Sequence, residues 1–298
     1  MFAEVLVPIF LLVGVGYGVG KLLHLEPKPL SRLAFWVFSP ALIFESLRTA
    51  TLSWNEMGVV AAFVGGHYFG MYLLSLPVGR LLFRDDRDAR AVASLVLTFG
   101  NCGNLGLPLL LFALGKRGME IGAVFLAANT VLLATLGVAI ASGKARASQA
   151  IGAILKVPWL YTVAAALVAR EFQGFPLWLS RATVALKQGA IPVFLILLGL
   201  QLSRVPLKKI AAGATRLAVA RLLLASSLAW AIAFLAGLKG TLRDALILEG
   251  SVPSAVNSLI LALEFDRRPD LAAAALFLST ALAAGTLWVT LLGLSAIP

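Results

Sequence analysis

The stretch GNCGNLGLP, residues 100–108, decides the fold, because it places glycine, asparagine and proline in the middle of an apolar run. A second stretch of the same kind, GSVPSAVN, follows at residues 250–257. Glycine and proline interrupt a helix and free backbone N–H and C=O groups, which hydrocarbon cannot satisfy. Such groups are tolerated where they line a polar cavity. The two stretches therefore predict two interrupted helices that meet at a polar site.

The composition of the chain indicates a membrane environment. Of the 298 residues, 60% are hydrophobic and 13% are charged, with a mean hydropathy of +0.94. A soluble domain carries about 25% charged residues and could not bury this much apolar surface. Ten apolar spans have about 20 residues each, the length that a hydrocarbon core of ~30 Å requires. They cover residues 3–23, 29–48, 56–79, 89–113, 119–142, 150–169, 177–202, 214–236, 241–263 and 270–293.

The basic residues lie at the ends of these spans, which indicates contact with the anionic headgroups of a lipid bilayer and not with nucleic acid. The net charge is +11, and alternate connections hold 17 and 8 of the 25 Lys and Arg residues. The richer set is expected to be cytoplasmic, and it includes Lys28, Arg84, Lys144, Arg221 and Arg267. The chain is then a multi-pass protein of the inner (plasma) membrane with both termini outside.

The chain divides into two similar halves. Pro40 in the second span corresponds to Pro192 in the seventh, 152 positions later, and the two interrupted stretches also correspond. A polar cytoplasmic linker at residues 143–149 separates the first half, 1–142, from the second half, 150–298. Because each half contains five spans, the second half is upside down relative to the first. We therefore expect an all-α polytopic membrane protein of ten transmembrane helices in two inverted five-helix repeats.

The same motifs resemble the auxin efflux carrier family, whose bacterial members include malate and malonate permeases. The resemblance rests on GNCGNLGLP, VPSAVN, the opening PIFLLVGVGYGVGK and the segment LSRLAFWVFSPALIFESL, and it covers essentially the whole chain. It implies a scaffold part and a transport part, in which helices 4 and 9 unwind and cross. It also implies a homodimer. The long cytoplasmic loop of many plant members is absent, and only the short segment near Lys144 stands in its place.

The predicted substrate site consists of polar and proline residues around the two interruptions: Asn101, Asn104, Pro108, Ser251, Pro253, Ser254 and Asn257. Amides and hydroxyls can hydrogen-bond an anion, or they can instead cap the interrupted backbone. Asn101 matches the crossover asparagine of the family. The prolines are expected to shape the backbone. A half-helix that begins after each interruption would direct N-terminal N–H groups and a positive dipole end at a carboxylate.

Glu249 is an acidic residue inside the ninth span, directly before the second interruption. Ionisable residues within membrane spans are expected to be functional. A buried carboxyl group suits a proton carrier, although it could also hydrogen-bond freed backbone. In the distantly similar bile acid/sodium symporters a carboxylate near this crossover helps to bind sodium. Both H⁺ and Na⁺ therefore stay open as coupling ions for Glu249.

These features predict a secondary active transporter that moves a small organic anion by alternating access. Malate, malonate, another carboxylate and an auxin-like aromatic acid all stay open as substrates. A sodium-coupled organic-anion symporter and a channel-like pore are the alternatives. An intramembrane enzyme is disfavoured, since there is no H-E-x-x-H motif and the only histidines, His24 and His67, lie far apart. Cys102 is the single cysteine, and no cofactor or metal is expected.

Overall fold

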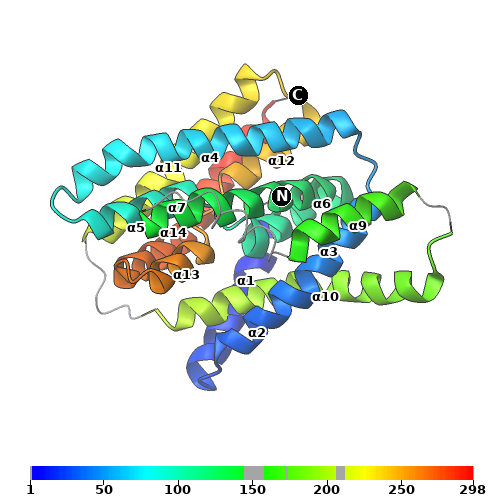
Figure 1. Ribbon diagram of the computed structural model, residues 1–298, viewed down its shortest axis with the longest axis horizontal. Coiled ribbons are helices and arrows are strands. Elements are labelled where there is room, and N and C mark those ends of the chain that lie inside the picture. Colours follow the sequence, from blue (N-terminus) through cyan, green and yellow to red (C-terminus); the bar gives the residue numbers. More distant parts are fainter. Residues whose placement is uncertain (1, 144–157, 172–173, 206–211, 298) are drawn as a thin grey trace.

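The computed structural model describes residues 2–143, 158–171, 174–205 and 212–297, and the regular elements in these ranges are all helical (Figure 1). Seven of these helices are long and apolar enough to cross a membrane. They are Ala3–Leu22, Pro27–Arg48, Trp54–Leu82, Cys102–Ser142, Leu177–Ser203, Ala212–Leu235 and Pro269–Ser295. The prediction of an all-α membrane protein is confirmed. The linker expected at residues 143–149 lies outside the described residues, except for Gly143.

Proline does not interrupt the second and seventh spans. The second span is one continuous helical stretch that comprises α2 (Pro27–Leu33), the π-helical turn η1 (Ala34–Phe38) and α3 (Ser39–Arg48). Pro40 lies in the first turn of α3, directly after the wider turn η1. A π turn re-registers the backbone hydrogen bonds, so the helix continues. Helix α10 (Leu177–Ser203) likewise runs through Pro192.

Two spans are interrupted near their middle, at the two stretches that the sequence singles out. The first consists of α5 (Arg87–Thr98), the π-helical turn η2 (Cys102–Gly106) and the beginning of α6 (Leu107–Leu132). The second consists of α12 (Gly240–Gly250) and α13 (Val256–Glu264). Helix α5 has 12 residues and so is about 18 Å long, too short to cross the hydrocarbon alone.

The fourth and fifth expected spans are joined more tightly than the sequence predicts. Instead of a connection over residues 114–118, Gly115 alone has non-helical angles (φ 64°, ψ −148°), and it joins two helical segments of α6. Glycine has no Cβ and adopts a positive φ without strain, so a single residue can redirect the chain. The helical path then continues through η3 (Leu133–Gly137) and α7 (Val138–Ser142).

The helices form two groups that lie side by side (Figure 1). In one group α1 (Phe2–Leu22) packs along α10, and α9 (Pro158–Glu171) packs on α3. In the other, α4 (Trp54–Leu82) and α11 (Ala212–Leu235) pack on each other, with α5, α12 and α14 (Pro269–Ser295) around them. Contacts of α6 with α1 and α3 connect the two groups.

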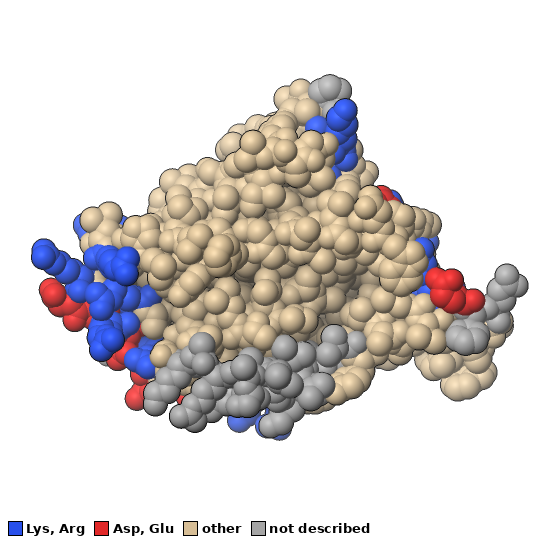
Figure 2. All heavy atoms as spheres, turned by 45° about the horizontal axis from the view of Figure 1, so that its top comes forward, with Lys and Arg blue, Asp and Glu red and all other residues tan. Residues whose placement is uncertain are grey.

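Charged side chains gather at the ends of the molecule, and Figure 2 shows a broad uncharged face between them. At one end, the connection before α5 is paired with the connection before α14, through Asp86 with Arg268 and Asp88 with Arg267. The backbone N–H of Ala89, followed by Arg268, holds the pKa of the Asp86 carboxyl below its ordinary value. This distribution matches a protein whose middle lies in hydrocarbon and whose ends lie among headgroups.

We predict that the close packing of α1 on α10 depends on glycine at the point of contact. A Cβ on Gly16 would collide with the backbone of Ile196, and a Cβ on Gly199 would collide with the backbone of α1. Gly16→Ala should therefore lower the melting temperature of the detergent-solubilised protein, because overpacking costs about 1–3 kcal/mol. Gly14→Ala, on the same helix with open space around it, is the control and should not lower it. An unchanged melting temperature in Gly16→Ala would contradict the packing.

Candidate functional site

The two interruptions cross and satisfy part of each other's backbone. Gly100 and Ser254 form an isolated antiparallel β-bridge. The Asn101 N–H donates to the Pro253 carbonyl at 2.8 Å, and the Ala255 N–H donates across the same bridge at 2.9 Å. Two chain segments about 150 positions apart thus pair through their backbone N–H and C=O groups, at the points where these groups have no hydrogen-bond partner within a helix.

A cavity of about 400 Å³ opens beside this crossing. Both interruptions contribute to its wall, together with η1 and the second half of α10. Lys28 and Arg32 lie at the α2 end of the lining, and none of the described residues that line the cavity is Asp or Glu. Aromatic side chains form much of the remaining wall: Phe35, Trp36, Trp159 and Phe194. The site is therefore a concave pocket with apolar walls and a basic edge.

The structure brings together the three predicted asparagines. Asn101, Asn104 and Asn257 all line the cavity. The other predicted residues lie outside its lining: Pro108, Glu249, Ser251, Pro253 and Ser254.

Each of these outer residues has its own surroundings near the crossing. Pro108 lies in the first turn of α6, and Pro253 contributes its backbone carbonyl to the crossing. The Ser251 hydroxyl donates to the Ile247 carbonyl at 2.7 Å, within its own helix. The Ser254 hydroxyl is buried and has no hydrogen-bond partner in the described structure.

Several amide atoms at the cavity have no protein partner. The Asn101 Oδ1 accepts a 3.3 Å bond from the Asn104 N–H, but the Asn101 Nδ2 is buried and bonds to none of the described residues. The same holds for Asn129 Oδ1 and Gln201 Oε1, and both residues also line the cavity. An unsatisfied buried polar atom costs about 1–3 kcal/mol, so these atoms are available to a ligand.

Asn129 was not among the residues predicted from the sequence. It lies on α6, and its side chain is 4% exposed. The available signal was an amide inside an apolar span, but nothing in the sequence places this part of α6 beside the crossing. The contact exists only because α6 folds back at Gly115.

Glu249 is fully enclosed and carries no hydrogen bond. It is 1% exposed, and neither carboxyl oxygen has a partner in the described structure. It packs against the backbone of Gly106, where a Cβ would collide with the carboxyl group. A Cβ on Gly122 would lie 3.3 Å from its Oε1. Two glycines on η2 and α6 therefore make the space that this side chain occupies.

The structure corrects the assignment of Arg221, which was expected in a cytoplasmic connection. It lies on α11 and is 1% exposed. Its guanidinium donates to the carbonyls of Leu97 (2.6 Å), Thr98 (3.2 Å) and Val252 (3.0 and 3.3 Å). Charge-assisted hydrogen bonds offset the cost of burying the guanidinium. The signal missed was a charged residue well inside an apolar span.

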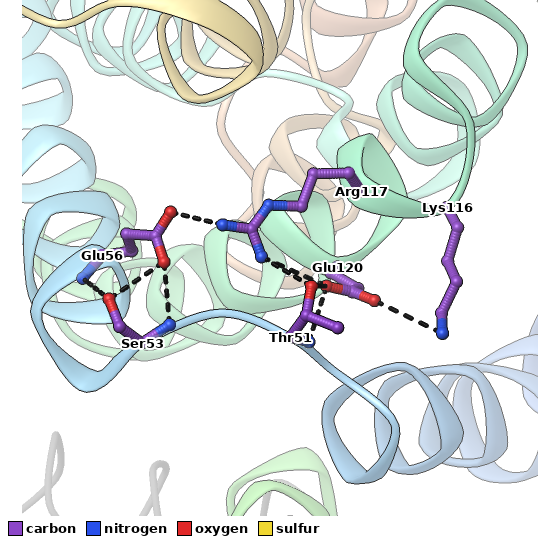
Figure 3. Close-up of polar contacts among 6 residues, drawn as sticks. All are labelled: Thr51, Ser53, Glu56, Lys116, Arg117 and Glu120. Carbon is purple, nitrogen blue, oxygen red and sulfur yellow. Dashed lines mark hydrogen bonds and ion pairs between the residues drawn. The ribbon is translucent and has the colours of Figure 1, made fainter.

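A second polar network joins the connection after α3 to α4 and α6 (Figure 3). Glu120 is 2% exposed and accepts hydrogen bonds from the Thr51 N–H at 3.0 Å and the Thr51 hydroxyl at 3.1 Å. Lys116 approaches its carboxylate at 3.8 Å, and Arg117 pairs with Glu56 at the start of α4. The network thus ties the connection after α3 to α6.

The network and the basic edge of the cavity lie a whole helix apart. Lys28 and Arg32 lie at the beginning of the stretch Pro27–Arg48, whose 22 residues extend about 33 Å, and Thr51 follows its end. The cavity therefore has its exposed, basic edge at one end of the helix, and the polar network lies past the other end.

Cysteine labelling from the two sides should reveal this asymmetry. Asn104 is partly exposed in the cavity, so Asn104→Cys in a Cys102→Ala background should react with an impermeant thiol reagent from the Lys28 side and be protected from the other. Adding Glu120→Ala should raise labelling from the protected side by about tenfold, because about 1–3 kcal/mol of closing contacts are lost. The Cys102→Ala protein without the new cysteine is the control. If the Asn104→Cys protein that retains Glu120 is labelled equally from both sides, the cavity is not one-sided.

Comparisons with known proteins agree with these observations. A family model described as "Membrane transport protein" matches residues 1–155 and 166–291. The chain is 26% identical to an "Uncharacterized transporter" of Methanocaldococcus jannaschii, over 93% of this chain and 94% of that protein. It is 28% identical to an "Uncharacterized transporter" of Methanothermobacter thermautotrophicus, over 94% of each chain. It is 26% identical to a "Putative malonate transporter" of Rhizobium meliloti, over 94% of this chain and 91% of that protein.

Proposed function

Because the chain belongs to the membrane transport protein family, we propose that it is a secondary transporter of a small organic anion that works by alternating access. The family match confirms the resemblance found in the motifs, and the similar proteins are named as transporters, not enzymes. One of them is named for malonate, a small dicarboxylate. The one-ended cavity at the crossing supports a carrier over a channel-like pore, since a carrier exposes its site to one side at a time.

The proposed architecture is ten helices in two inverted repeats, with crossover helices 4 and 9. The two interrupted spans, α5 with η2 and α6, and α12 with α13, support it because they occupy corresponding places in the two halves. The basic residues favour an inner-membrane protein with both termini outside and the cavity open to the cytoplasm. The family resemblance favours a homodimer.

The observation that carries the choice of an anion is the electrostatic character of the crossing. The first residues of η2 and α13, Cys102 and Val256, line the cavity, so two helical segments begin at its wall. Helix N-termini present free N–H groups and a positive partial charge of roughly half an elementary charge. The unpartnered Asn101 Nδ2 adds a neutral donor, and the basic edge attracts anions. A carboxylate is the ligand that satisfies these donors.

Removal of the cavity asparagines should weaken anion binding. A melting-temperature screen against organic acids identifies a ligand, because binding to the folded state raises stability. We expect Asn101→Ala, Asn257→Ala and Asn129→Ala each to weaken the binding of that acid by about 1–3 kcal/mol, the cost of stranding a hydrogen-bonding partner. Isothermal titration of the purified variants measures this loss.

Asn55→Ala is the matched control, because Asn55 is exposed on α4 and does not line the cavity. It should bind the acid with the affinity of the parent protein. If the three cavity variants also bind like the parent, the asparagines do not form the site, and only the backbone donors remain as a basis for anion binding.

Glu249 is the proposed carrier of a coupling proton. Its carboxyl group is buried beside η2, and no positive charge or donor among the described residues holds it in a permanent ion pair. A group that binds and releases a proton during transport needs this freedom from a fixed partner. Its packing against Gly106 links its protonation to the helical segment that begins at the cavity.

Glu249→Gln is expected to abolish uptake driven by a pH gradient and to leave anion binding measurable, since glutamine keeps the shape and cannot carry the proton. Uptake into proteoliposomes, with and without a pH gradient, measures the effect. Glu264→Gln, at an exposed position of α13, is the control. An active Glu249→Gln protein with unchanged pH dependence would remove Glu249 from coupling, and a sodium dependence lost in this variant would favour the symporter alternative.

A further inference from the structure

The crossing of the interrupted helices has a negative pole as well as a positive one. Helices α5 and α12 both end at the interruptions, and the last carbonyls of a helix lack intrahelical partners. Each C-terminus carries about half a negative charge, so two of them together attract a cation. Carbonyl oxygens from two unwound segments are also the ligands by which transporters of this architecture coordinate Na⁺.

A side chain of the protein already occupies this pole. The Arg221 guanidinium donates to Leu97 and Thr98 at the end of α5 and to Val252 directly after α12. It therefore binds the carbonyls of both interruptions at once. The planar guanidinium suits this geometry, because its five N–H groups form a fixed fork.

The Arg221 guanidinium forms no ion pair with an acidic side chain among the described residues. None of the ion pairs in the described part of the chain involves Arg221, and its four hydrogen bonds all go to backbone carbonyls. A charge that is 1% exposed would be very costly without compensation. The two helix ends supply that compensation, so the guanidinium functions as the cation of the crossing.

The backbone at the crossing is shaped to admit this guanidinium. A Cβ on Gly100 would lie 2.5 Å from Arg221 Nη2 and 2.8 Å from Val252 Cγ2. A residue larger than glycine at position 100 would push the side chain away from its carbonyls. Gly100 also forms the β-bridge to Ser254. The same residue therefore pairs the two interruptions and leaves the space that the Arg221 guanidinium occupies.

We propose that Arg221 is a built-in replacement for a coupling cation, so that the protein binds and transports its anion without Na⁺. The inference rests on the proposed function and decides between its two coupling alternatives. With the carbonyls of both interruptions bonded to the guanidinium, a sodium ion would have to displace a tethered cation. Arg221 is a positioning residue, since it holds the helix ends and does not line the cavity.

The first arm of the test needs no variant and no substrate. The melting temperature of the purified full-length protein is measured in sodium, potassium and choline chloride at equal ionic strength. We expect the same melting temperature in all three salts. A rise that is specific to Na⁺ would reveal a free sodium site and overturn the proposal.

The second arm removes the tethered cation. Arg221→Ala should melt at a lower temperature than the parent, and millimolar guanidinium or Na⁺, but not choline, should raise it again, because a free cation can enter the vacated pole. Arg216→Ala is the matched control: the same residue type on the same helix, but exposed, so no cation should rescue it. A purely structural role would not create a cation-selective rescue. An Arg221→Ala protein that melts like the parent in every salt would overturn the proposal.

The third arm measures transport of radiolabelled malonate into proteoliposomes. The parent protein should take up malonate equally in sodium and choline, and Arg221→Ala should lose about tenfold or more, since hydrogen bonds to a charged group contribute more than neutral ones. If Arg221→Ala does not fold, Arg221→Gln replaces it, because a glutamine amide can still donate hydrogen bonds to carbonyls but carries no charge. Parent uptake that requires Na⁺ would overturn the proposal. If no uptake of any organic acid is found while the melting arms hold, the proposed function fails and the cation role of Arg221 stands.

Discussion

The backbone of two interrupted helices must be satisfied in the middle of a membrane protein, and the rest of the structure depends on this constraint. Residues 99–101 and 251–255 leave helical geometry in the middle of the protein. They pair with each other through the Gly100–Ser254 bridge, and Arg221 binds the carbonyls that the bridge leaves free. Hydrocarbon tolerates irregular backbone only when the protein supplies its partners. The interruptions therefore determine which helices must lie together.

Satisfying the crossing in this way gives it two poles of opposite sign. The C-terminal ends of α5 and α12 meet at the Arg221 guanidinium, and the segments that begin at Cys102 and Val256 reach the cavity wall. A fixed positive charge behind the crossing and two positive helix ends at the cavity act in the same direction on an approaching anion. An anion site can thus form without any basic residue in the interruptions themselves. In the proposed function the neutral asparagines at the cavity orient the anion and permit its release.

The two ends of the molecule are built differently, which suits a protein that changes shape. Lys28 and Arg32 form an exposed edge of the cavity, and the network of Thr51, Glu120 and Arg117 joins helices at the other end. The network is small and partly solvent-accessible at Arg117, so it can separate at moderate energetic cost. The close packing of α1 on α10 through Gly16 and Gly199 is, by contrast, a rigid contact. The proposed alternating access would move the crossing group against this rigid group.

The sequence alone determined the membrane environment, the helical class and the location of both interruptions, because these follow from local composition and from the residues that break a helix. It also determined the three asparagines that line the cavity, which lie inside the interrupted stretches. Only the tertiary structure decided that Asn129 also lines the cavity and that the Ser251 hydroxyl bonds to its own helix. It also decided that Arg221 is buried at the C-terminal ends of α5 and α12 and does not lie in a cytoplasmic connection. The physical reason is that the roles of Asn129 and Arg221 depend on which groups meet between helices that are distant in the sequence. Arg221, for example, bonds to carbonyls 31 and 124 positions away. Such contacts are fixed by packing and not by any local pattern.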